Sequence, residues 1–240
     1  MYRVGLPLFP LNLVLFPDAP LPLHIFEERY RDMVRECLET DRSFGVILVN
    51  QDATNQDMAR IHSIGTIAHI VDTRPYPDGR YDIMCLGRER FQVESHQNDR
   101  SYHTASVTIL NETGARSGRL GPADTSATSG AIATKTIVEL RSLLATLISA
   151  TTTDEIRTEQ LGRIAQAIPS EPIALSYFAA RILPTANVAD RQELLEIPDA
   201  STRLLKVQEH LKRERLVANQ LKEISKKSVA RGDGVGHVFN

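Results

Sequence analysis

Leu6–Val34 is an apolar run that is interrupted by prolines and ends in a helical pattern. This run constrains the fold more than any other part of the chain. Prolines at positions 7, 10, 17, 20 and 22 interrupt the run. Proline lacks a backbone N–H and biases the residue before it away from helical conformation. The run is therefore expected to form short extended pieces of a β domain, followed by a helix that begins near Phe26.

The same run does not fit a membrane-spanning helix or a secretory signal. A spanning helix needs about 20 apolar residues without interruption, and the prolines break the run into shorter pieces. Only Arg3 precedes the run, and no small-residue cleavage site follows before Glu27 and Glu28. We therefore expect a cytoplasmic protein that makes no membrane contact.

Composition indicates an ordinary soluble globular protein. The 240 residues are 42% apolar and 24% charged, with no tryptophan. Cys37 and Cys85 lie far apart without CxxC spacing, which favours two reduced core thiols over a metal site. His62 and His69 are seven residues apart in a strand-like region, so they should face opposite sides of a sheet. We expect neither a metal ion nor a cofactor.

Charge is distributed unevenly along the chain. Residues 1–202 carry 19 basic and 26 acidic side chains, whereas residues 203–231 carry 9 basic and 3 acidic ones. A basic terminal segment can bind nucleic acid or an anionic surface. The interpretation that we favour is a solvated helix end, because cations are stabilised near the C-terminus of a helix.

Residue periodicity changes from two to about 3.6 along the chain. Strands are expected at Gly45–Val49, Ile64–Thr73 and Ala105–Ile109, and on either side of a bulge or bend at Gly87, at Tyr81–Cys85 and Phe91–Val93. Pro77–Gly79 has the composition of a turn. Helices are expected at 137–148, at 153–168, at 173–183 with Ser170 as its cap, at 187–196, and from Pro198 as far as Lys227.

These patterns predict an α+β protein. A barrel-like β subdomain with one inserted helix is expected at residues 1–110, and a flexible linker or loop at 111–130. A helical bundle is expected at 131–227, and a disordered tail at 228–240.

Three segments also carry a family resemblance. Leu6–Met33 contains LPLFPL, FP and PLHIFEERYRDM, Ile64–Val93 contains IGT, DGR and GRERF, and Leu194–Leu216 reads LLEIPDASTRLLKVQEHLKRERL. In this order they resemble the N-terminal domain family of Lon protease, which also occurs in stand-alone bacterial proteins and in cereblon. The resemblance implies a PUA-like bent β-barrel.

The catalytic parts of a Lon protease are not recognisable in the sequence. A phosphate-binding loop requires GxxxxGK[ST], and the similar segment Gly130–Thr136 has Thr134 in place of the second glycine. A Ser–Lys dyad needs a desolvated lysine, whereas Lys135 borders a low-complexity segment. We therefore expect no catalytic residue and no enzymatic activity.

The resemblance implies non-catalytic recognition of unfolded or apolar polypeptide segments, with a separate protease or chaperone as a further candidate partner. The residues of the matching motifs that are candidates for peptide binding or for a structural role are His24, Phe26, Glu27, Arg29, Tyr30, Gly87, Arg90 and Phe91. For the charged and aromatic residues of this set we favour a structural ion pair or cap that holds the first helix against the barrel, and these residues are Glu27, Arg29, Tyr30 and Arg90. The alternative is that Arg90 and the neighbouring loops form the wall of a peptide groove. The alternative function is RNA binding, which the net acidic body of the chain disfavours.

Overall fold

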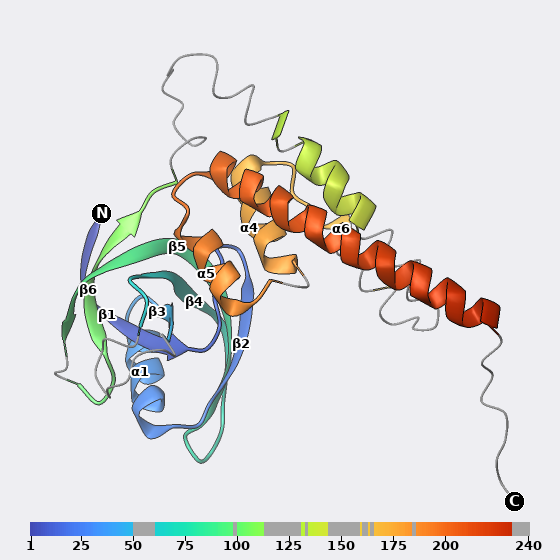
Figure 1. Ribbon diagram of the computed structural model, residues 1–240. Helices are drawn as coiled ribbons and strands as arrows, with labels where there is room; N and C mark the ends of the chain where they lie inside the picture. Colours follow the sequence, from blue (N-terminus) through green and yellow to red (C-terminus); the bar gives the residue numbers. More distant parts are fainter. Residues whose placement is uncertain are drawn as a thin grey trace, which may run out of the picture.

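The computed structural model describes residues 1–49, 61–97, 100–112, 131–132, 134–143, 159, 163, 166–183 and 186–231. Most of the predicted linker, residues 113–130, lies outside this range, as do residues 232–240 of the predicted tail and most of the helix predicted at 153–168. Figure 1 shows a strand-rich N-terminal half and a helical C-terminal half. The α+β class predicted from the sequence is confirmed.

Six strands form one sheet in the N-terminal half. They are β1 (Tyr2–Leu11), β2 (Pro20–Ile25), β3 (Ser43–Leu48), β4 (Ile64–Pro75), β5 (Tyr81–Gln97) and β6 (Thr104–Leu110). The inserted helix, α1 (Glu28–Glu39), connects β2 to β3. It begins two residues after Phe26, close to the predicted position.

Five of the strands close into a barrel. β1 pairs in parallel with β3 and antiparallel with β6. Antiparallel pairing then runs from β3 to β4, from β4 to β5 and from β5 to β6, which completes the ring. β2 pairs with the first part of β5, from Tyr81 to Leu86, and so extends the sheet outside the ring. The result is the barrel-like β subdomain that the alternating pattern predicts.

The barrel interior is packed around Phe91. Its side chain is buried with a small apolar cluster that comprises Leu6, Leu8, Ile47, Ile67, Ala105 and Val107. Gly45 and Gly65 lie against the ring, and a Cβ atom at either position would approach the Phe91 side chain to 2.7 Å. Glycine is therefore needed at both positions because the aromatic ring occupies the space of a side chain.

Helix α1 covers the outside of the barrel with one apolar face. Its buried residues are Tyr30, Met33, Val34 and Cys37. The rings of Tyr30 and Phe9 meet edge to face, with their centroids 4.3 Å apart. Cys37 and Cys85 are both free and buried, as predicted, and burial raises the pKa of each thiol to about 12.

The helical half contains α4 (Pro172–Ile182), α5 (Val188–Glu196) and α6 (Ala200–Arg231). Glu171, rather than the predicted Ser170, caps α4, because its carboxylate accepts a hydrogen bond of 2.8 Å from the N–H of Ala174. A reciprocal pair of hydrogen bonds between Asn187 and Asp190 caps α5. In Figure 1 the helical residues 134–143 lie beside α6, where the side-chain amide of Gln208 donates to the Thr136 hydroxyl at 2.9 Å.

Candidate functional site

The eight candidate residues of the matching motifs lie in three different environments. Tyr30 and Phe91 are buried in the packing of the β half. Gly87 and Arg90 lie where the barrel meets the helical half, which we call the joint. The remaining four, His24, Phe26, Glu27 and Arg29, are at the surface around the end of β2 and the start of α1.

At the joint, the side chain of Arg90 extends from β5 to the end of α5 and the connection between α5 and α6. Its guanidinium donates to the carbonyl oxygens of Leu195 at 2.6 Å and Ile197 at 2.8 Å. It also lies 2.8 Å from the Glu112 carboxylate, and its side chain is only 2% exposed. These contacts connect the barrel to the helical half. The partner expected from the sequence was instead the first helix, α1.

Glu112 has a second buried arginine as its partner. Arg203 of α6 lies 3.2 Å from the same carboxylate, and its guanidinium lies 4.0 Å from the centroid of the Tyr177 ring. The Tyr177 hydroxyl also donates to Glu112. Burial lowers the pKa of Arg203 to about 10, although the charge of Glu112 opposes this shift. Arginine is protonated at neutral pH, so two buried cations depend on one carboxylate and the surrounding carbonyl oxygens.

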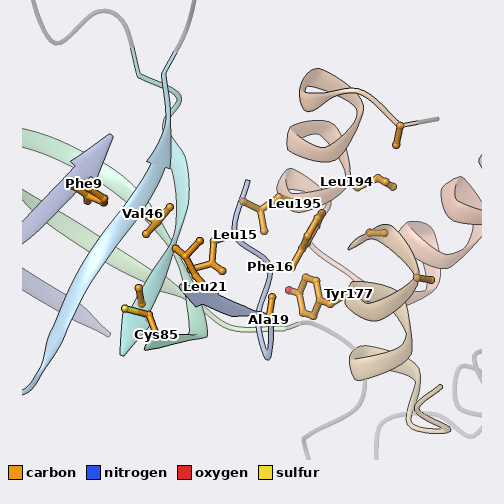
Figure 2. Packing of buried hydrophobic residues seen from close by; sticks show 14 of the residues in the cluster. Phe9, Leu15, Phe16, Ala19, Leu21, Val46, Cys85, Tyr177, Leu194 and Leu195 are labelled. Atoms are coloured by element: carbon orange, nitrogen blue, oxygen red, sulfur yellow. The ribbon is translucent and has the colours of Figure 1, made fainter. Parts of the chain in front are cut away.

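The loop between β1 and β2 forms the apolar part of the joint. Figure 2 shows Phe16 directed from this loop toward Tyr177 of α4 and Leu195 of α5. The loop crosses closely over β5, where the N–H of Gly87 donates to the Ala19 carbonyl at 2.9 Å. A Cβ atom at Gly87 would lie 2.2 Å from the backbone oxygen of Phe16.

Gly87 therefore satisfies two requirements at once. The register between β4 and β5 shifts close to it, between Thr66 and Ala68, which confirms the predicted bulge. In addition, the close passage of the loop leaves no space for a side chain at position 87. The second requirement is a contact between segments about 70 residues apart (Phe16 and Gly87), so local sequence patterns do not reveal it.

The exposed candidates border a surface that we call the hairpin face. It is the outward side of β2 and of the adjoining parts of β4 and β5, with His24, Phe26, Val71, Tyr76, Asp82 and Met84. His24 Nδ1 lies 2.6 Å from Asp82 Oδ1, and the Tyr76 hydroxyl donates to Asp82 Oδ2 at 2.5 Å. The Tyr76 hydrogen bond, followed by that of His24, lowers the pKa of Asp82.

Apolar side chains are exposed on this face. Phe26 is 62% exposed, and its ring stacks on the His24 ring with the centroids 6.2 Å apart. Met84 pairs across the strands with Pro22 on one side and Asp72 on the other. Val71, also exposed, lies at the register shift next to Asp72. The hairpin face therefore combines exposed apolar side chains with a hydrogen-bonded polar group.

Glu27 and Arg29 form a local pair at the start of α1. The Arg29 guanidinium lies 2.8 Å from the Glu27 carboxylate and 4.5 Å from the centroid of the Tyr30 ring. His62 and His69, the other histidines considered from the sequence, are not brought together. His62 lies 3.4 Å from Glu196, and His69 hydrogen-bonds Ser43.

Sequence reasoning identified His24 and Phe26 on the hairpin face but missed Asp82, Met84 and Val71. A signal for Asp82 and Met84 was present in the sequence. Since Tyr81, Ile83 and Cys85 alternate toward one side of β5, Asp82 and Met84 must point to the other side. No such signal marks Val71, because its exposure depends on the register shift in β4.

Neither a metal-ion site nor a membrane-spanning helix is found in the described ranges. Within these ranges, no group of three or more His, Cys, Asp or Glu side chains is arranged to hold a metal ion. No helix in the part of the chain covered by the structure is long and apolar enough to cross a membrane.

Residues 5–213 match the family described as the ATP-dependent protease La (LON) substrate-binding domain. The chain belongs to this family. The match includes the joint, the first part of α6 and the barrel except for Tyr2–Val4 of β1.

Relatives and solved structures agree with this assignment. The chain is 28% identical over 228 residues to Lon protease 1 of Bdellovibrio bacteriovorus, an alignment that covers 90% of this chain and 26% of that protein. It is 31% identical over 109 residues to a Lon protease of Cytophaga hutchinsonii, covering 45% of this chain and 13% of that protein. The chain thus matches at most about a quarter of the length of these Lon proteases.

The fold is similar to that of a Lon N-terminal domain protein from Xanthomonas campestris. The TM-score is 0.57 at 26% identity, and the alignment covers 86% of this chain and 98% of that chain. The N-terminal domain of Lon protease from the Mycobacterium avium complex gives a TM-score of 0.55 at 16% identity, with 87% of this chain and 98% of that chain covered. The latter similarity concerns the fold alone.

Proposed function

We propose that this protein recognises unfolded or exposed apolar segments of other polypeptides without acting on them chemically. The observation that carries the proposal is membership, over residues 5–213, in a family described as a substrate-binding domain of protease La. The substrate of a protease is polypeptide. A separate protease or chaperone would then receive the bound segment.

The hairpin face is the surface that we assign to this function. Phe26, Val71 and Met84 are large apolar residues that remain exposed. An unfolded segment exposes apolar side chains, and covering both sets of side chains from water favours association. The Asp82 network adds fixed polar atoms beside Phe26, as is typical of recognition surfaces.

Backbone pairing at the β2 edge contributes little to this binding. The hydrogen bond from the Gly87 N–H to the Ala19 carbonyl shows that Ala19 directs its backbone toward β5. In an antiparallel pair, the direction of the backbone groups alternates from one residue to the next. It follows that residues 20, 22 and 24 direct their backbone groups toward the open edge. Two of these, Pro20 and Pro22, have no N–H to offer. Side-chain contact, rather than strand addition, is therefore the binding mode that we propose for the hairpin face.

The test uses a second protein as the probe. This probe has disulfide bonds in its native form, stays unfolded in buffer after reduction and carboxymethylation, and carries a fluorescein label. We expect saturable binding by fluorescence anisotropy, and competition by the same protein unlabelled but not by its native, disulfide-bonded form. Replacing both Phe26 and Met84 with serine should weaken the binding by about tenfold or more, since two apolar contacts are lost.

A matched control variant is available on the other half of the molecule. Leu205 of α6 is 49% exposed, comparable to the apolar residues of the hairpin face. Leu205→Ser should leave the binding unchanged. Equal binding of the unfolded and native probes, or equal losses in the two variants, would refute the proposed function of the hairpin face.

A further inference from the structure

Among the described residues, the beginning of β1 has a strand partner on one side only. On one side, Tyr2–Pro7 pairs with β6. On the other side, pairing with β3 is found at Leu8–Leu11 and not before it within the described ranges. The first residues of β1 therefore form an edge of the sheet, whereas Leu8–Leu11 of the same strand pair with β3 and close the barrel.

The direction of the backbone groups at this edge follows from one hydrogen bond. The N–H of Ile109 in β6 donates to the Met1 carbonyl at 2.8 Å. In an antiparallel pair, residues alternate between bonding to the partner strand and facing away from it. Tyr2 and Val4, which alternate with Met1, consequently direct their N–H and C=O groups toward the open side.

The side chains of these two residues are exposed as well. Tyr2 is 59% and Val4 is 65% exposed. In an uninterrupted strand they would share the face of Leu6 and Leu8, which is buried in the barrel. The register shift between Arg3 and Leu6, with Gly5 at a φ of 70°, breaks this alternation. Beside Gly5 there is open space, since a Cβ atom there would meet no atom within 4 Å.

This edge differs from the β2 edge in the groups that it presents. β2 directs two prolines toward its open side, whereas the β1 edge contains no proline before Pro7. Tyr2 and Val4 together offer two N–H donors and two carbonyl acceptors, with the two-residue spacing that an extended strand matches.

We infer that the Met1–Gly5 edge of β1 is a second polypeptide-binding site, which takes an extended apolar segment of another protein by strand addition. The main-chain groups of Tyr2 and Val4 bind the backbone of that segment, and their side chains contact its apolar side chains. This site accepts the class of ligand in the proposed function, but it lies on a different element and uses backbone rather than side-chain recognition.

The probe is the fluorescein-labelled peptide Lys-Val-Thr-Val-Thr-Val-Lys, whose alternating residues favour an extended chain. We expect saturable binding to the full-length protein by anisotropy, and slower amide hydrogen exchange at Tyr2 and Val4 when the peptide is bound. The same peptide with N-methylated valines cannot donate from those positions. Its binding should be weaker by about tenfold or more.

Two variants of the protein test the edge directly. Val4→Pro removes one outward N–H and should weaken binding of the unmodified peptide about three- to tenfold. Val4→Ala is the matched control for the lost side chain and should retain most of the binding. Circular dichroism checks that the proline variant is folded, and the N-methylated peptide tests the inference on the unaltered protein if it is not.

The outcomes separate this inference from the proposed function. Replacing Phe26 and Met84 with serine should leave binding of the valine–threonine peptide, and its loss on N-methylation, unchanged. Equal binding of the methylated and unmethylated peptides would overturn strand addition. A concentration-dependent dimer in sedimentation that is lost in Val4→Pro would instead assign the edge to a second copy of this chain and overturn our choice of ligand.

Discussion

The joint and the hairpin face contain residues of the same sequence motifs but place them in opposite environments. At the joint, Arg90 and Arg203 are buried and share the Glu112 carboxylate, so one negative charge lies between two positive charges inside the protein. On the hairpin face, His24 and Asp82 pair at a surface that is open to solvent. The comparison teaches that residues of the same motifs in this chain lie either in buried contacts that hold the two halves together or at the surface, and that burial distinguishes the two.

Glu112→Gln should have the largest effect on the joint. The amide keeps the shape of the side chain but removes the negative charge, which leaves two buried arginines without a carboxylate. We expect the free energy of unfolding to fall by about 3–5 kcal/mol, measured by urea denaturation followed by circular dichroism. An unchanged unfolding midpoint would mean that the carbonyl oxygens around Arg90 and Arg203 suffice without the carboxylate.

Gly87→Val should have the next largest effect. The new Cβ would lie 2.2 Å from the Phe16 backbone oxygen, so the loop or β5 must move. Overpacking of this kind costs about 1–3 kcal/mol, and thermal unfolding measures it. Met84→Val is the control, since it places the same branched side chain on the exposed side of the same strand. Equal melting temperatures for the two variants would contradict the close contact.

Asp82→Asn should have the smallest effect on stability. The Asp82 side chain is exposed, and exposed ion pairs contribute little. We expect a melting temperature at pH 7 close to that of the unaltered protein. Because the pKa of Asp82 is lowered on folding, any stability from its charge is present above the unfolded value, about 3.9, and is lost as pH falls through the folded pKa. A large destabilisation at pH 7 would place the hairpin face with the joint as a structural element.

Local sequence patterns predicted most elements of the fold. The strand expected from Ile64 and the helix expected at 187–196 agree with β4 and α5 to within a few residues. The turn at Pro77–Gly79 is confirmed, because Gly79 has a φ of 82°. Each of these predictions depends on neighbouring residues, whose backbone preferences act over a few positions.

Such local patterns could not predict the contacts of the joint. Arg90 is bound by the Leu195 carbonyl, 105 residues later in the chain, and nothing in the residues around Arg90 indicates this partner. The cap of α4 illustrates a smaller failure of the same kind. Ser170 and Glu171 both have side chains that can accept from an N–H, and the geometry of the first turn selects Glu171. On the hairpin face, the alternation along β5 does indicate Asp82 and Met84.

The joint also sets an order of events during synthesis of the chain. Phe16 and Arg90 leave the ribosome long before Leu195, because 105 residues separate Arg90 from that partner. Translation at about 5–20 residues per second makes this interval roughly 5–20 s. For that time the nascent barrel exposes the apolar loop around Phe16 and a cation without its carbonyl partners. In those seconds the chain itself presents the kind of surface that molecular chaperones hold.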